Sequence, residues 1–222
     1  MELILCIKNM IRGVMMKKII SIILTVVSIL SLCITANAAE LTEQQRAELY
    51  DLGIIVGDGD GDLRLYDAVT RAEAVKMLCV AGNLTSQHTA DCFDDVPETH
   101  WAYPYICAAK EAGLASGDET GSFHPDSNIT NEEMVKMIVC LLGYGPQAEV
   151  MSGYPAGYTA VAARIGVTKG LTLDVNTPAL RNDVAVMLSN ALNIPLMEKV
   201  EEGVYRIMDG TYGIPLQTLK NK

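Results

Sequence analysis

Residues 69–78 read VTRAEAVKML, and residues 129–138 read ITNEEMVKMI. In each stretch a Glu follows a Thr by three residues, which is a capping box: both side chains bond to free backbone N–H groups at a helix start. Apolar residues then recur at helical spacing. Residues 179–188, ALRNDVAVML, are a weaker copy with Leu180 and Asp183 at the two capping positions. The predicted capping residues are Thr70, Glu73, Thr130 and Glu133.

A second anchor precedes each stretch at a nearly constant distance. A Gly-x-x-x-Gly core after an apolar residue lies at 52–57, 112–117 and 165–170. The second glycine precedes the acidic residue by the same interval in the first two copies and by three residues fewer in the third. Two motifs that recur three times with nearly constant spacing indicate a tandem repeat.

Each copy is predicted to be a helix, a polar glycine-rich loop and a second helix. Such a pair cannot bury its apolar face alone, so the three pairs should pack around a common centre as an all-α fold. In the third copy, Thr177-Pro178 looks like an N-cap followed by Pro at the first helical position, which would place Arg181 about a turn inside the helix. The expected helices span about 42–50, 70–82, 102–112, 130–142, 157–165 and 178–194.

The amino-terminal segment is predicted to be an export signal. Two lysines precede an apolar run over 19–34, and an Ala-Asn-Ala pattern then ends at Ala38, where we expect cleavage. An uncleaved membrane anchor is the alternative. Residues 1–15 precede a complete signal, which suggests that translation begins at Met15 or Met16. The predicted divisions are a signal at 1–38, repeats at 39–90, 91–147 and 148–197, and a tail at 198–222.

Composition limits the possible partners. The chain has 222 residues, of which 50% are apolar and 20% charged, so it is long enough to bury a core. Lys and Arg number 17 against 27 Asp and Glu, which gives a net charge of −10. This charge argues against binding of nucleic acid or anionic lipid through general electrostatics, so an anionic partner needs a local site. We expect no nucleic acid partner, and no membrane contact after cleavage.

No catalytic, metal or cofactor motif is recognisable. The acidic run at 58–62 resembles the opening of a calcium loop, but Leu63 and Val69 stand where Gly and Glu belong. The three histidines lack ligand spacing, and neither H-E-x-x-H nor G-x-S-x-G occurs. We therefore predict a protein that is not an enzyme and that needs no metal or cofactor.

Four cysteines remain after the predicted cleavage. Export permits disulfides, so three pairings or none are open. Cys79 and Cys140 lie in apolar helical stretches, where a free cysteine behaves as a small buried hydrophobe. Reduced, structural cysteines are therefore favoured. The four residues are Cys79, Cys92, Cys107 and Cys140.

Three long stretches resemble S-layer homology domains, over about residues 41–197. They are LYDLGIIVGDGDGDLRLYDAVTRAEAVKML, FDDVPETHWAYPYICAAKEAGLASGDETGSFHPDSNITNEEMVKMI and GYTAVAARIGVTKGLTLDVNTPALRNDVAVMLSNAL. The resemblance implies a pseudo-threefold spindle of three repeats around a central helical bundle. It also implies inter-repeat grooves that bind secondary cell-wall polymer, typically a glycan with pyruvyl ketals, and so hold an exported bacterial protein on the wall or in the S-layer.

Arg71 is the first candidate for glycan binding, and Arg181 is the second. A cation in the first turn does not help the helix dipole, so Arg71 is better explained by a ligand, whose carboxylate its guanidinium can hold beside free helix amides. Pairing of Arg71 with a nearby acid is the alternative. Asn131 holds the equivalent position in the second copy and lacks the charge.

Trp101 and Asp94 complete the candidate site. Trp101 can stack on a sugar ring, and the alternative, which is favoured, is that it anchors the core between repeats. Asp94, like its neighbour Asp95, either bonds to sugar hydroxyls or caps the next helix, and capping is favoured. Four tyrosines that could line a groove cannot be ranked: Tyr103, Tyr105, Tyr154 and Tyr158.

The predicted function is non-covalent attachment of a secreted protein to the bacterial cell wall. One alternative is a scaffold whose repeats bind other surface proteins, and another is a wall-active enzyme, for which no catalytic carboxylate stands out. The tail, which does not continue the repeat, leaves open a stand-alone protein or a fragment of a longer surface protein.

Overall fold

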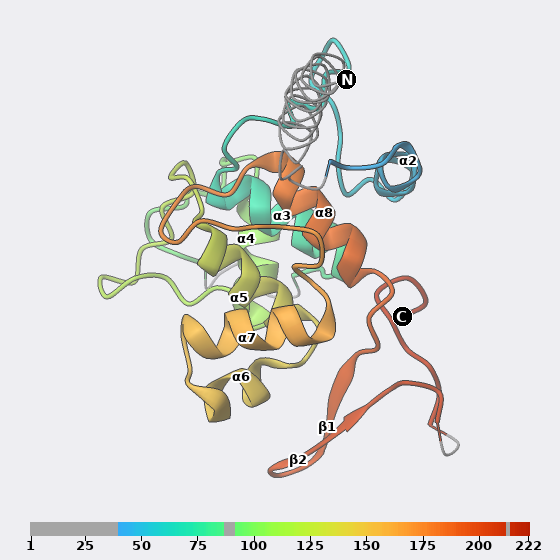
Figure 1. Ribbon diagram of the computed structural model, residues 1–222. Helices are drawn as coiled ribbons and strands as arrows, with labels where there is room; N and C mark the ends of the chain where they lie inside the picture. Colours follow the sequence, from blue (N-terminus) through green and yellow to red (C-terminus); the bar gives the residue numbers. More distant parts are fainter. Residues whose placement is uncertain (1–39, 87–91, 212–213) are drawn as a thin grey trace, which may run out of the picture. The chain divides into compact units, whose positions relative to one another are not determined.

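The computed structural model describes residues 40–86, 92–211 and 214–222, so the predicted signal at 1–38 lies outside the described residues. The described part is mainly helical, as predicted, with one small two-stranded sheet (Figure 1). The elements are α2 (Glu43–Asp51), α3 (Arg71–Gly82), α4 (Tyr103–Glu111), α5 (Asn131–Leu141), α6 (Gly145–Met151), α7 (Ala156–Ile165), α8 (Arg181–Ala191), β1 (Met197–Glu201) and β2 (Val204–Ile207).

A closed ring of three backbone hydrogen bonds joins the three copies. The Val69 N–H donates to the Ala179 carbonyl (2.9 Å), the Ala179 N–H to the Ile129 carbonyl (2.9 Å), and the Ile129 N–H to the Val69 carbonyl (3.0 Å). Each of these residues directly precedes the helix N-cap of its copy, and all three are completely buried. The three anchors of the repeat therefore lie together at one point in the fold.

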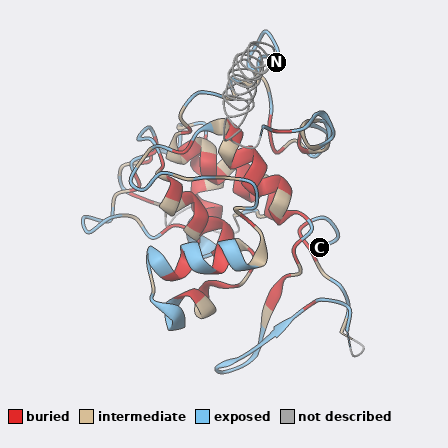
Figure 2. Ribbon diagram, in the orientation of Figure 1, coloured by how far each residue is buried: buried red, intermediate tan, exposed pale blue. Residues whose placement is uncertain are grey.

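The first helix of each copy packs on the second helix of another copy. α4 packs on α3, α7 packs on α5, and α2 packs on α8. The second helices α3, α5 and α8 also contact one another, and most of their residues are buried (Figure 2). One copy therefore leaves its apolar face uncovered until its neighbours are in place.

The start of α8 differs from the expectation. The helix begins at Arg181, so the prediction that Thr177-Pro178 opens it is wrong. The Thr177 carbonyl accepts the Asn131 N–H (3.1 Å), and Pro178 pairs with Thr130 in an isolated bridge. The backbone of this segment is therefore paired with the second copy. The helix begins only at the residues that follow the segment.

Two of the four cysteines form a disulfide. Cys92 and Cys107 are bonded, with their Cα atoms 5.0 Å apart, so the expectation of reduced cysteines is wrong for this pair. The bond ties the segment before α4 to that helix. Cys79 and Cys140 are free, and burial raises the pKa of the Cys79 thiol to about 12.

The tail folds back on the helices through an antiparallel hairpin, which the sequence did not predict. The Met197 N–H donates to the Leu142 carbonyl (2.9 Å), and Lys220 forms an ion pair with Glu48 of α2. Gly143 lies at this contact with φ +87°, and a Cβ there would be 1.9 Å from the Met197 carbonyl oxygen. Only glycine therefore fits at this position.

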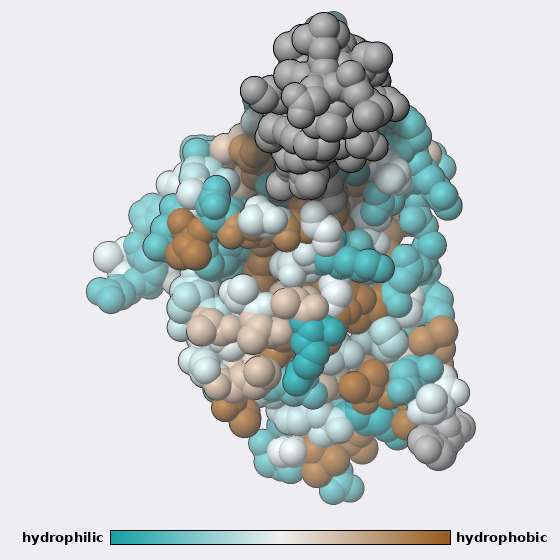
Figure 3. All heavy atoms as spheres, in the orientation of Figure 1, coloured by the Kyte–Doolittle hydropathy of each residue, from teal (hydrophilic) through white to brown (hydrophobic). Residues whose placement is uncertain are grey.

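The outer surface is mixed in polarity. On the face shown in Figure 3, hydrophilic residues surround scattered hydrophobic ones. Helix α6 was not predicted from the sequence, and its residue Val150 is 89% exposed. Among the residues that the structure describes, no helix has the length and apolar character needed to cross a membrane.

Candidate functional site

Arg71 opens α3 and reaches into the second copy. Its Nε donates to the Phe123 carbonyl (2.8 Å), and its Nη1 bonds to Glu133 Oε1 (2.8 Å). The guanidinium lies 4.9 Å from the centre of the Phe123 ring, and the side chain is 14% exposed. Arg71 therefore helps to join two copies.

Arg181 holds the same position at the start of α8, so the expectation that it lies a turn inside the helix is wrong. Its Nη2 donates to the Val56 carbonyl (3.1 Å), and its Nη1 lies 3.6 Å from Glu73 Oε1. Glu73 and Glu133 each act twice: Oε2 accepts the N–H of the capping Thr, and Oε1 faces an arginine of another copy. Both capping boxes are present.

The first-turn amides of α3 are occupied by the protein itself. The N–H groups of residues 71–73 donate, in order, to the Ser127 carbonyl, the Pro125 carbonyl and the Thr70 hydroxyl. The expectation of free amides beside the guanidinium is therefore wrong. A ligand at this place would meet side chains, because the helix N-terminus is already satisfied.

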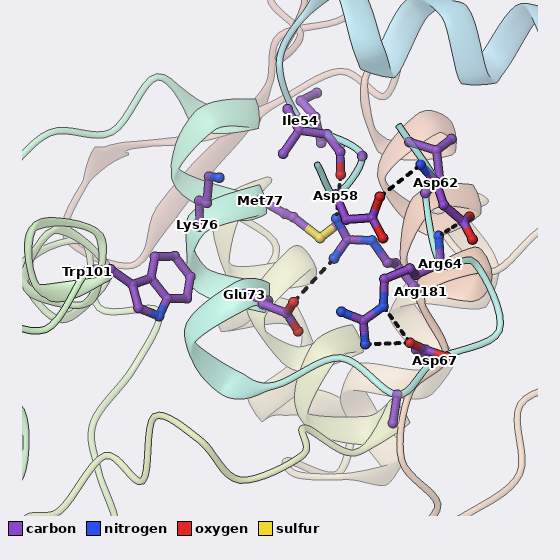
Figure 4. Close-up of a pocket in the computed structure, with 14 residues that line it drawn as sticks. Ile54, Asp58, Asp62, Arg64, Asp67, Glu73, Lys76, Met77, Trp101 and Arg181 are labelled. Carbon is purple, nitrogen blue, oxygen red and sulfur yellow. Dashed lines mark hydrogen bonds and ion pairs between the residues drawn. The ribbon is translucent and has the colours of Figure 1, made fainter. Parts of the chain in front are cut away.

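One groove, here the Arg181 groove, is lined by Arg181, Lys76 and Trp101 (Figure 4). Figure 4 shows Glu73 between Trp101 and Arg181. Trp101 is 52% exposed, and the Lys76 Nζ lies 5.9 Å from its ring centre. The alternative that Trp101 anchors the core is therefore wrong. Other charged residues that line this groove are Asp58, Asp62, Arg64 and Asp67.

A second groove, here the Arg71 groove, has an equivalent set of side chains. Arg71, Glu133, Lys136 and Tyr154 line it. Tyr154 takes the place of Trp101, is 47% exposed, and lies 5.2 Å from the Lys136 Nζ. Burial, and next the charge of Glu133, raise the pKa of Tyr154, so its hydroxyl remains protonated at neutral pH.

Lys76 and Lys136 were not predicted as site residues. Both are half-buried, and neither forms an ion pair with any residue in the described ranges. A signal for them was present in the sequence, because each follows the capping Glu of its copy by three residues. Each adds a positive charge to one of the two grooves.

The third junction between copies lacks this chemistry. Asn131 stands in place of the arginine, Val186 in place of the lysine and Leu41 in place of the aromatic residue. All three are at most 5% exposed. The Asn131 amide donates to the Asp174 carbonyl (3.0 Å) and the Thr177 hydroxyl (2.9 Å). Asn131 is therefore both uncharged, as the sequence shows, and buried in the structure.

Asp94 lies outside both grooves and is exposed, so the structure does not bring it together with the arginines. Its neighbour Asp95 accepts the N–H groups of Phe123 (2.8 Å) and His124 (2.6 Å). Helix α4 begins after Ala102 without a side-chain cap. The favoured capping role of this acidic pair is therefore wrong, and Asp95 instead holds the loop that carries Phe123.

The acidic loops are held by their own backbones. Asp58 Oδ1 accepts the N–H groups of Asp60 (3.0 Å) and Asp62 (3.1 Å), as an ordinary acidic turn does. Asp118 acts in the same way in the second copy. Within the described residues, no cluster of three potential metal ligands occurs.

Protonation of Asp118 is expected to destabilise the fold in acid. The hydrogen bond from His124 (2.7 Å) and then those from Thr120 and Ser122 hold the pKa of Asp118 well below its usual range. The folded state thus favours the carboxylate, and this stabilisation is present above about pH 4 and lost as the pH falls further. The urea midpoint should fall as the pH is lowered from about 4 to about 2, and less steeply in Asp118→Asn. Equal slopes would contradict this.

The described part is a mainly helical module with two grooves between copies, and comparisons give its family. Residues 93–135 match the S-layer homology domain, so the chain contains an S-layer homology domain. The middle cell wall protein of Brevibacillus brevis is 29% identical over 93% of this chain and 20% of its own length. The cell surface protein of Thermoanaerobacter kivui is 33% identical over 70% of this chain and 20% of its own length.

An enzyme is also among the relatives. An endoglucanase of a Bacillus species is 37% identical over 41% of this chain, which is only 10% of that protein. The chain spans about a fifth of the length of the two cell-surface relatives. The family match and the cell-surface relatives indicate a secreted, cell-wall-associated protein.

Proposed function

We propose that this chain attaches its protein to the bacterial cell wall by binding secondary cell-wall polymer, a glycan with pyruvyl ketals, in the Arg71 and Arg181 grooves. The binding is non-covalent. Trp101 and Tyr154 provide ring faces for sugars, and the basic side chains donate hydrogen bonds to oxygen atoms of the polymer.

One observation carries the proposal: an arginine, a lysine and an exposed aromatic ring recur together at two junctions. Within one protein, a requirement of packing alone would apply to all three junctions. The third junction instead has small or apolar buried residues at the same positions. The third junction therefore packs without the basic and aromatic side chains. This supports ligand binding as the reason for those side chains at the other two junctions.

Sedimentation with purified cell walls tests the proposal. We expect the exported protein to sediment with intact walls and to remain in solution after the secondary polymer has been removed chemically. Arg71→Ala and Arg181→Ala should lower retention. Because both arginines also join copies, each variant is compared with wild type by circular dichroism and urea unfolding before its retention is interpreted.

Other outcomes would favour the other functions. Equal retention on intact and stripped walls would reject glycan binding. Retention that requires other surface proteins would support a scaffold, and release of soluble sugar or peptide fragments from the walls would support an enzyme.

A further inference from the structure

The two grooves differ in charge. The Arg181 groove is lined by four carboxylates and three cations, because Asp58, Asp62, Asp67 and Glu73 face Arg64, Lys76 and Arg181. The Arg71 groove is lined by one carboxylate, Glu133, and two cations, Arg71 and Lys136. The first groove therefore has a negative balance and the second a positive one.

Two substitutions in the loop account for much of this difference. The positions of Asp62 and Asp67 in the first copy correspond to Ser122 and Ser127 in the second. In addition, Asp118 lies outside the lining of the Arg71 groove, whereas its counterpart Asp58 lines the Arg181 groove. The two loops occupy equivalent positions in their copies but differ in charge.

The cations of the Arg181 groove are also largely engaged. Arg64 Nε donates to Asp67 (2.7 Å), and Arg181 faces Glu73. A further carboxylate, brought by a ligand, would be repelled by the acidic side chains that already line this groove. The same carboxylates can accept hydrogen bonds from sugar hydroxyl groups. The exposed indole of Trp101 offers a face for an uncharged sugar ring.

We propose that the grooves divide the polymer by charge: the Arg71 groove holds its carboxylate-bearing sugar, and the Arg181 groove holds an uncharged sugar stacked on Trp101. This inference rests on the proposed function. In the Arg71 groove, Lys136 is the charge that distinguishes the acidic sugar from a neutral one.

Two matched probes test the division: oligosaccharides released from the wall polymer, and the same oligosaccharides with their carboxylates converted to amides. Trp101 is the only tryptophan of the chain, so its fluorescence reports on the Arg181 groove. We expect the affinities for the two probes, measured by the fluorescence of Trp101, to differ less than threefold. In calorimetry, Lys136→Met should weaken binding of the acidic probe at least tenfold and that of the amidated probe less than twofold.

The outcomes separate the two proposals. If Lys136→Met weakens both probes equally, or if Trp101 responds only to the acidic probe, the division by charge is wrong while wall-polymer binding stands. If neither probe binds to the wild-type protein, the proposed function is wrong and the division falls with it. Lys199→Met, on the hairpin, serves as the control for loss of a positive charge and should bind both probes as wild type does.

Discussion

Replacing Lys136 with Met is expected to lower the affinity for wall polymer by about ten- to a hundredfold, since a hydrogen bond to a charged group contributes roughly 1.5–3 kcal/mol. The Lys136 ammonium lies in the Arg71 groove and forms no ion pair with a described residue. Its stem is half-buried, and the methionine retains most of that packing. The loss should therefore fall on binding and not on folding.

Retention on purified walls, measured over a series of protein concentrations, gives the affinity. Lys199→Met is the matched control, because Lys199 lies on the hairpin and pairs with Glu202 outside both grooves. We expect its retention to equal that of wild type. Binding by Lys136→Met that stays within twofold of wild type would remove this lysine from the site.

Phe123→Ala is expected to lower the free energy of unfolding by about 3–5 kcal/mol, as truncation of a buried aromatic side chain commonly does. Phe123 is completely buried, and its ring centre lies 5.3 Å from that of Phe93. The Arg71 guanidinium also lies over the ring. One cavity would therefore weaken the core and the wall of the Arg71 groove together.

Urea unfolding followed by circular dichroism measures this change. Tyr66→Ala is the control, because Tyr66 is an aromatic residue that is 76% exposed, and surface substitutions of this kind cost less than about 0.5 kcal/mol. A loss below about 1 kcal/mol for Phe123→Ala would show that neighbouring side chains fill the space, and would contradict the importance given to this ring.

The helix starts could be predicted because their signal is local. Thr70 and Thr130 each cap through a residue three positions away, so the sequence interval alone specifies the contact. At Thr177-Pro178 the same reasoning was wrong, because the backbone there is used by the second copy. Local pattern predicts structure until a contact from a distant part of the chain competes with it.

The candidate site was predicted in part. Arg71 could be named because a cation in the first helical turn does not help the helix dipole, Arg181 because it is the equivalent arginine of the third copy, and Trp101 because its ring can stack on a sugar. Lys76 and Lys136 were missed, because a lysine on a helix is usually solvated and only the fold places these two in grooves.

The sequence by itself determined the helical class and the capping boxes, which depend on neighbours within a few residues, and the tandem anchors, which recur as short motifs along the chain. The tertiary structure alone decided that Cys92 pairs with Cys107, that Arg71 meets Glu133, and that two junctions are open while the third is closed. The disulfide joins two segments of the second copy, whereas the other contacts lie between copies, where the geometry depends on how the chain closes its ring at Val69, Ile129 and Ala179.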